Sequence, residues 1–100
     1  MEFRYTPELL EYMKKKNNTT VLVELVEVNN TDLEVTELHV RLADKRIREL
    51  FLGKKRYRSV TTEVGEVLLP PFPLELDEVV TFGLKKVLFL EYMTCKGIKV

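Results

Sequence analysis

The segment that most constrains the fold is residues 79–100, VVTFGLKKVLFLEYMTCKGIKV, the longest predominantly apolar part of the chain. Because apolar side chains leave water when a chain folds, we expect this segment to be mostly buried. Lys85 and Lys86 interrupt it, and its longest unbroken apolar run is residues 87–90. A membrane-spanning helix needs about 20 apolar residues. The segment therefore predicts core elements of a water-soluble fold and no membrane partner.

Two parts of this segment alternate between apolar and polar or small residues, which is typical of β-strands. These parts are residues 80–83 and residues 93–96. The run 87–90 fits a buried strand or a single helical turn equally well. Gly97 permits a bend or a bulge, and we expect the chain after it to be held in the core or in a sheet.

One hundred residues with 45% hydrophobic and 32% charged content favour a single globular domain over residues 1–100. Sixteen acidic and sixteen basic residues balance, so the net charge indicates no particular partner. One cysteine cannot form an internal disulfide, and no apolar signal segment follows Met1. Both observations favour the reducing cytoplasm.

The clearest local signal predicts a helix over residues 7–16, after a short strand over residues 1–5. Thr6 can cap this helix, and Pro7 suits its first position. Three lysines in the last turn complement the helix dipole. The apolar face of the helix is predicted to contain Leu9, Leu10 and Met13, with Tyr12 at its edge.

Residues 20–41 are predicted to form a β-hairpin. Residues 20–28 are rich in β-branched types, residues 29–32 have turn chemistry, and residues 33–41 give the return strand. The apolar positions of the return strand switch from odd to even numbers. This switch predicts a bulge near Thr36 or Glu37.

In the second half of the chain, the spacing of the apolar residues changes more than once. Helical spacing predicts a short helix over residues 43–52 that stops at Gly53. A strand from Tyr57 to Val64, a turn at Gly65 and a return strand from Glu66 to Leu69 follow, and the proline-rich residues 70–73 must form a stiff loop. We therefore predict an α+β fold with mainly antiparallel β-sheet, an N-terminal helix and a second short helix.

Cys95 and His39 are the soft metal-ligand types of the chain, and they lie far apart in the sequence. A metal site usually needs several such residues, and a catalytic thiol needs an adjacent base. A lone cysteine is more often a buried apolar residue, so we interpret Cys95 as structural and keep a metal ligand as the weaker alternative. His39 is expected on the solvent face of a strand, because no partner motif accompanies it.

The strongest charge feature is the stretch 41–58, with eight basic residues against two acidic ones. A basic stretch with an interleaved aromatic residue, here Tyr57, is typical of surfaces that bind phosphates and stack on bases. More often such a stretch is a solvated face or meets an acidic protein surface, and the remaining chain is net acidic. Nucleic-acid binding is therefore kept only as an alternative. The predicted anion or partner patch contains Arg46, Arg48, Lys54, Lys55, Arg56 and Arg58.

Six acidic residues of the second half are candidates for a paired-carboxylate site. They flank expected turns and strand ends, where solvated acids are common. The sequence contains no glycine-rich phosphate loop, serine elbow or metal-binding helix motif. We therefore predict no enzymatic activity, no catalytic residue and no cofactor. The six acids are Glu63, Glu66, Glu75, Asp77, Glu78 and Glu91.

Several short patterns resemble HesB-like domains, the group that contains A-type iron–sulfur carriers and cysteine-poor relatives in bacteria. Residues 5–10, YTPELL, resemble the opening strand, threonine and helix of that group, and the strand over 21–28 resembles its first long strand. Residues 65–69, GEVLL, resemble its middle, and residues 87–98 resemble the tail of one branch of small relatives. The resemblance implies the α+β fold of that group.

The chain departs from that group in its cysteines. The carriers bind iron or a cluster through a cysteine after the early strands and a closely spaced pair near the end. Residues 29–32 occupy the early position here without a thiol, and Cys95 matches neither site. The resemblance therefore implies a HesB-like domain without cluster ligands.

These observations together predict a non-catalytic, cytoplasmic, bacterial HesB-like domain that acts through contact with a protein partner or with itself as a homodimer. One alternative is an iron–sulfur or metal carrier that uses Cys95 across a dimer. The other is nucleic-acid binding through the stretch 41–58.

Overall fold

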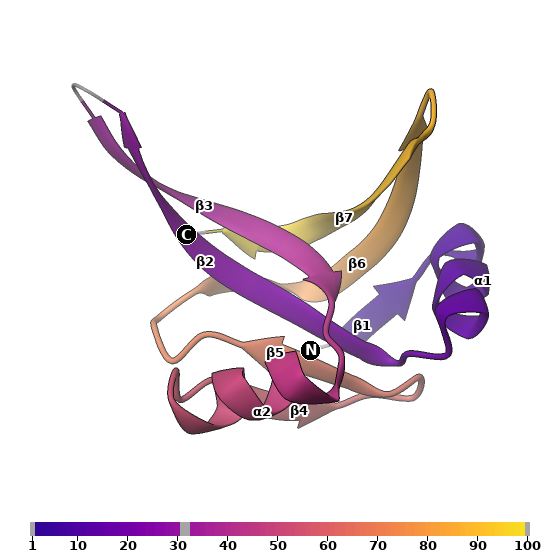
Figure 1. Cartoon of the computed structure of the whole chain (residues 1–100), viewed down its shortest axis with the longest axis horizontal. Coiled ribbons are helices and arrows are strands. Elements are labelled where there is room, and N and C mark those ends of the chain that lie inside the picture. Colours follow the sequence, from indigo (N-terminus) through magenta and orange to yellow (C-terminus); the bar gives the residue numbers. More distant parts are fainter. Residues whose placement is uncertain (1, 31–32, 100) are drawn as a thin grey trace.

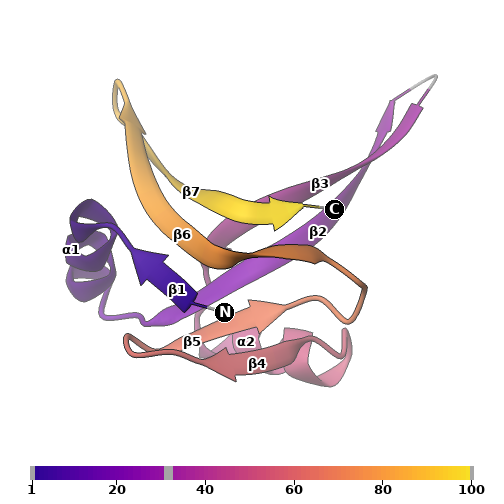
Figure 2. The ribbon, with the colours of Figure 1, turned by 180° about the vertical axis from the view of Figure 1, so that it is seen from behind.

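The computed structural model describes residues 2–30 and 33–99. Two β-sheets enclose a shared core, with helix α1 (Pro7–Lys16) beside one sheet and helix α2 (Lys45–Gly53) beneath the other (Figure 1). This arrangement confirms the predicted α+β class. Two hairpins extend from the body and diverge, as both views show (Figure 2). They are formed by β2 (Thr20–Asn30) with β3 (Leu33–Leu42) and by β6 (Glu75–Val87) with β7 (Leu90–Lys99).

The predicted N-terminal helix is confirmed as α1 (Pro7–Lys16). The Thr6 hydroxyl accepts a hydrogen bond from the backbone N–H of Leu9 at 3.3 Å, which caps the first turn. Leu9 and Met13, one turn apart, are buried against the core, whereas Leu10 is exposed. Leu10, which is 39% exposed, lies at the edge of the covered stripe of this helix.

The second predicted helix is confirmed as α2 (Lys45–Gly53), two residues later than its predicted start. Asp44 is its N-cap, and the carboxylate accepts a hydrogen bond from the backbone N–H of Ile47 at 2.8 Å. Gly53 is the last helical residue, and Lys54 keeps helical dihedral angles at the C-cap. Phe51 is the buried residue of this helix.

The first sheet has the strand order β1–β6–β7, with β1 (Glu2–Tyr5), β6 (Glu75–Val87) and β7 (Leu90–Lys99). β1 pairs with β6 in parallel, and β6 pairs with β7 in an antiparallel ladder. The ladder shifts register between Leu76 and Thr81, opposite Gly97, whose φ is +100°. The irregularity predicted at Gly97 is therefore confirmed, and only glycine adopts this φ without strain.

The second sheet has the order β3–β2–β5–β4, with β2 (Thr20–Asn30), β3 (Leu33–Leu42), β4 (Arg58–Thr61) and β5 (Glu66–Leu69). β4 is shorter than the predicted strand from Tyr57 to Val64, because a turn over residues 62–65 begins after Thr61. β2 pairs in parallel with β5, and the other pairs are antiparallel. The two parallel pairs were not predicted, because they join strands far apart in the sequence.

The core has two parts that lie on opposite faces of the second sheet. Val21 and Val23 of β2 point into the larger part between the sheets, and Leu22 points to the smaller part beneath α2. The start of β2, residues 21–23, is therefore buried on both faces, as its dense apolar sequence indicates. The larger part contains Leu9, Met13, Val21, Val23, Val67, Leu69, Val80 and Phe82, and the smaller one contains Leu22, Ala43, Phe51, Tyr57 and Leu68.

The bulge predicted near Thr36 or Glu37 is wrong. The register from Val21–Leu42 to Asn30–Leu33 is continuous. β3 is an edge strand of its sheet, so the face that carries its apolar residues can change along the strand without a change of register. Residues 31 and 32 of the predicted turn lie outside the described residues.

The expectation that residues 79–100 are mostly buried is wrong in the middle of the segment. Val80 and Phe82 are buried, but the run 87–90 is neither a buried strand nor a helical turn. It forms the end of the β6–β7 hairpin and is exposed.

Candidate functional site

The β6–β7 hairpin ends in an apolar turn that projects away from the body of the protein (Figures 1 and 2). Val87 pairs with Leu90, and Leu88 and Phe89 form the two-residue connection. Phe89 is 100% exposed, Leu88 93%, Leu90 71% and Val87 42%. We call these four residues the apolar tip.

The apolar tip differs from other exposed apolar residues because its members are contiguous. Leu10, Leu50 and Phe72 are also exposed, but none of them adjoins another exposed large apolar residue, and they lie on separate elements or loops. Single exposed apolar residues are normal in soluble proteins, whereas contiguous ones mark contact surfaces. The apolar tip is therefore the candidate functional site.

Leu88 has a left-handed backbone conformation, with φ of 56°. Phe89 does not share the positive φ, which is the sign pattern of a type II′ turn, where glycine is preferred at the first connecting residue. A bulky residue in this region costs on the order of 1–3 kcal/mol. Local strain and exposure of an apolar side chain thus coincide at one residue.

Replacing Leu88 with glycine is expected to stabilise the fold by about 0.5–1 kcal/mol. The change removes the left-handed strain, while the exposed leucine side chain contributes little packing that could be lost. Thermal unfolding followed by circular dichroism measures the shift. A melting temperature lower than that of the wild type would contradict the strain at this position.

Polar and charged residues flank the apolar tip. Lys85 and Lys86 precede it on β6, and Glu91 and Tyr92 follow it on β7. In the ladder Lys86 is opposite Glu91 and Lys85 is opposite Tyr92, and all four are exposed. Lys86 lines a hollow that also contains three glutamates, Glu8, Glu11 and Glu91, whereas Lys85 does not line it. An acidic rim on a covering surface would therefore face Lys85.

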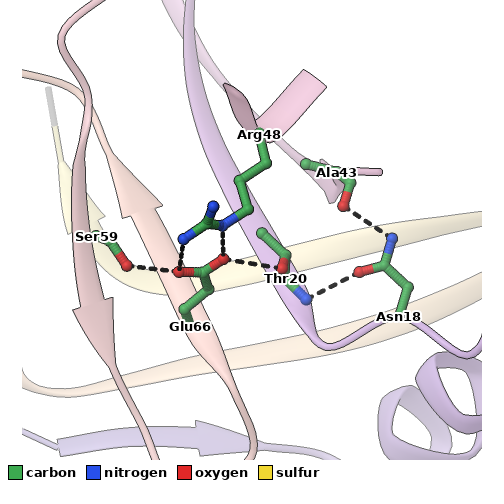
Figure 3. A network of polar contacts seen from close by, with 6 residues as sticks. All are labelled: Asn18, Thr20, Ala43, Arg48, Ser59 and Glu66. Carbon is green, nitrogen blue, oxygen red and sulfur yellow. Dashed lines mark hydrogen bonds and ion pairs between the residues drawn. The ribbon is translucent and has the colours of Figure 1, made fainter. Parts of the chain in front are cut away.

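A polar network centred on Glu66 joins α2 to β2, β4 and β5 (Figure 3). The Arg48 guanidinium donates to both carboxylate oxygens of Glu66, from Nε and, at 3.2 Å, from Nη2. The hydroxyls of Ser59 and Thr20 donate to the same carboxylate, at 2.6 and 3.1 Å. Glu66 is therefore fully engaged by groups of this chain.

The bond with Arg48 holds the pKa of the Glu66 carboxyl below its ordinary value of 4.5, and the hydroxyls of Ser59 and Thr20 act in the same direction. Partial burial opposes them. A carboxyl with a lowered pKa in the folded state stabilises the fold fully above pH 4.5, and this contribution is lost as the pH falls through the folded pKa.

A Glu66→Gln variant is expected to be less stable than the wild type by about 1 kcal/mol at pH 7, with the difference shrinking below pH 4.5. The exposed Glu63 makes none of these bonds, so Glu63→Gln is the control. Urea unfolding at pH 7 and pH 3 measures both differences. If Glu66→Gln lost equal stability at the two pH values, the network would not depend on the charge of Glu66.

An open hollow of about 530 Å³ lies beside this network, between the end of α1 and the start of α2. Its acidic lining residues are already used, because Asp44 caps α2 and Glu66 binds Arg48. Among the described side chains, no buried nitrogen or oxygen lacks a hydrogen-bond partner. The network thus fits a structural role that joins α2 to the second sheet.

The predicted basic patch is only partly available. Arg48 is bound to Glu66, whereas the other five residues are exposed, Arg46 in the first turn of α2 and the rest between the end of α2 and the start of β4. Tyr57 is buried and packs edge-on against Phe51, with ring centroids 4.8 Å apart. Because Tyr57 cannot offer a stacking face, the patch lacks the aromatic platform that nucleic-acid binding would use. The five exposed residues are Arg46, Lys54, Lys55, Arg56 and Arg58.

Cys95 and His39 are not brought together in one environment. Cys95 is half-buried on β7, next to the larger core, and burial raises the pKa of its thiol to about 11. His39 is exposed on β3, as predicted, and its ring lies 3.0 Å from a carboxylate oxygen of Glu37. A thiol with a raised pKa is a poor nucleophile and a poor metal ligand at neutral pH.

The six candidate acids do not form a cluster within residues 2–30 and 33–99. No group of three or more histidine, cysteine, aspartate or glutamate side chains there could hold a metal ion. Glu66 is used in the network, and Glu63 lies in an open hollow with Glu2.

Within residues 2–30 and 33–99, no helix is long and apolar enough to cross a bilayer.

Comparisons with protein families, with curated proteins and with solved structures returned no match for this chain.

The apolar tip is the site that sequence reasoning missed. The signal was present, because the run 87–90 is bracketed by Lys85 and Lys86 on one side and Glu91 on the other. Charged residues on both sides of a short apolar run suit a projecting hairpin end as well as a buried element. Apolar character alone favoured burial, and this is why the prediction failed.

Proposed function

We propose that this chain is a non-catalytic interaction module that docks to a protein surface through the apolar tip. The observation that carries the proposal is the contiguous exposure of Leu88, Phe89 and Leu90 at the end of a projecting hairpin. No other contiguous apolar exposure of this extent occurs among residues 2–26 and 37–99, whose side-chain burial the structure describes.

The tip suits a protein pocket for energetic reasons. Protein interfaces draw most of their binding energy from a few residues, often aromatic, that fill pockets on the partner. Fully burying one such side chain contributes about 1.5–3 kcal/mol, so burial of Phe89 and Leu88 together would contribute about 3–6 kcal/mol toward docking. The two-residue turn holds both side chains on a short connection, which limits the conformational entropy lost on docking.

The module is, in this proposal, a HesB-like domain without cluster ligands. The half-burial of Cys95 beside the core supports a structural role for the thiol over the metal-carrier alternative. The burial of Tyr57 and the engagement of Arg48 weigh against nucleic-acid binding. The HesB-like assignment, the bacterial origin and the cytoplasmic location stay predictions from the sequence.

Site-specific photocrosslinking tests the proposal. A benzophenone amino acid replaces Phe89 in one sample and the exposed Phe72 in a matched control, and the crosslinked proteins are identified by mass spectrometry. Phe72 is 59% exposed but lies in the loop of residues 70–73, away from the hairpin. We expect one protein to be crosslinked from position 89 and not from position 72.

The identified protein is then purified and titrated against three forms of this chain. Phe89→Ser is expected to weaken binding at least tenfold, and Phe72→Ser is expected to leave it unchanged. Equal affinity for the wild type and Phe89→Ser, or crosslinks that do not differ between the two positions, would remove the apolar tip as the contact surface.

A further inference from the structure

The apolar tip has a complementary surface on the same protein. An open hollow of about 460 Å³ lies between the start of β1 and the end of β4. We call it the acidic hollow. Its lining residues are Glu2, Phe3, Thr61, Thr62 and Glu63.

The acidic hollow matches the tip in size. A cavity of about 150 Å³ is sufficient for a benzene molecule, so about 460 Å³ accommodates the ring of Phe89 together with part of Leu88. The half-buried ring of Phe3 lines the hollow and is held in place by stacking on Phe82, with ring centroids 5.9 Å apart. An entering aromatic side chain would therefore meet a fixed aromatic surface.

The acidic hollow also matches the tip in charge. Glu2 and Glu63 are exposed at the hollow, and none of the lining residues that the structure describes is basic. Glu2 is paired with Arg4 at 3.0 Å, but an exposed pair of this kind is weak and does not remove the negative potential. Lys85, on the strand that leads to the tip, is the cation that would face these carboxylates.

We propose that the apolar tip of one copy of this chain inserts into the acidic hollow of a second copy. This inference rests on the proposed function and names the partner. The tip lies at the outer end of the β6–β7 hairpin, whereas the strands that form the hollow, β1 and β4, lie in the body, apart from the tip in both views (Figures 1 and 2). Within one molecule the apolar tip therefore does not cover the acidic hollow.

The contact joins two different surfaces, so it is heterologous. Each copy offers one tip and one hollow, and copies add head to tail into chains or rings larger than a dimer. The tip is smaller than the roughly 800 Å² that each partner of a stable interface contributes. The association is accordingly weak, with a dissociation constant on the order of 10–100 μM.

Sedimentation velocity over a concentration series tests the proposal with the purified full chain. The wild type is expected to grow from the 11.7 kDa monomer beyond the dimer as its concentration rises. Phe89→Ser removes the tip, and Glu63→Lys places a cation at the hollow opposite the lysines of the incoming tip. Each variant alone is expected to associate at least tenfold more weakly, and Phe72→Ser is expected to behave as the wild type does.

Mixing the two deficient variants gives the sharpest result. The Phe89→Ser copy keeps its hollow and the Glu63→Lys copy keeps its tip, so an equimolar mixture forms dimers and nothing larger. A wild type that stays monomeric to about 0.5 mM, a Phe89→Ser variant that associates as the wild type does, or a mixture that fails to dimerise would each overturn the proposal.

The outcomes also separate this inference from the proposed function. A monomeric wild type whose position 89 crosslinks a different protein removes self-association and leaves the docking function intact. A monomeric wild type that crosslinks nothing removes both. Cosedimentation of that monomer with phosphatidylserine-containing vesicles, lost in Phe89→Ser, would remove both in favour of a lipid surface.

Discussion

Two phenylalanines of the β6–β7 hairpin are expected to respond oppositely to alanine. Phe82→Ala should lower the free energy of unfolding by about 3–5 kcal/mol, because the side chain is fully buried and contacts the rings of Phe3 and Tyr5. Phe89→Ala should change it by less than about 0.5 kcal/mol, because Phe89 is fully exposed. The two residues are of the same type and lie on one hairpin, so the difference between the two losses of stability reports the effect of burial.

Urea unfolding at neutral pH measures both changes, and thermal unfolding gives a second reading. For a domain of this size the Phe82 variant should melt on the order of 20 °C below the wild type. A loss of more than 1 kcal/mol in Phe89→Ala would show that the tip is packed in the folded protein, and the proposed docking would lose its basis.

Gly65→Ala is expected to destabilise the fold by about 2–3 kcal/mol. A Cβ atom at this position would lie 2.2 Å from the carbonyl oxygen of Thr19, which is backbone and cannot rotate away. The same oxygen accepts a hydrogen bond from the backbone N–H of Glu66 at 3.1 Å. The clash therefore separates β2 from β5 at the point where their parallel pairing begins.

Gly53→Ala is the matched control, because no atom lies within 4 Å of a Cβ atom there. Gly53 is the last residue of α2, so alanine should stabilise the protein by up to about 1 kcal/mol. Denaturant unfolding of both variants provides the comparison. Similar stability of Gly65→Ala and the wild type would mean that β5 can move away from Thr19 without loss of pairing.

These predictions separate the folding role of the β6–β7 hairpin from its proposed contact role. The inner part of β6 contributes Val80 and Phe82 to the core, and the outer part carries the apolar tip beyond it. Changes at the tip are expected to alter association without unfolding the protein. This independence makes the proposed docking experiments interpretable.

Local signals in the sequence predicted most elements of the fold. The cap at Thr6 and the proline at position 7 determined where α1 begins, and Gly97 marked the irregularity of β7. These signals depend on residues that are close in the chain, so they can be read without tertiary information. The parallel pairs β1–β6 and β2–β5 left no local signal, since each joins distant segments.

The candidate site was less predictable than the fold. Each prediction about Arg48, Tyr57 and Cys95 depended on which neighbours the fold would supply. Glu66 neutralises Arg48, the smaller core takes up Tyr57, and Cys95 lies beside the larger core. Charge and side-chain type can be read from a sequence, but exposure cannot.

The sequence by itself determined the α+β class, both helices and the hairpin over residues 20–41, because capping, periodicity and turn chemistry act over a few residues. Only the tertiary structure decided that the run 87–90 lies in water. Apolar residues are buried when another element covers them, and among the strands of residues 2–30 and 33–99 only β6 and β7 extend to the end of this hairpin. The most apolar segment of the chain thus supplies both part of the core and the exposed contact surface.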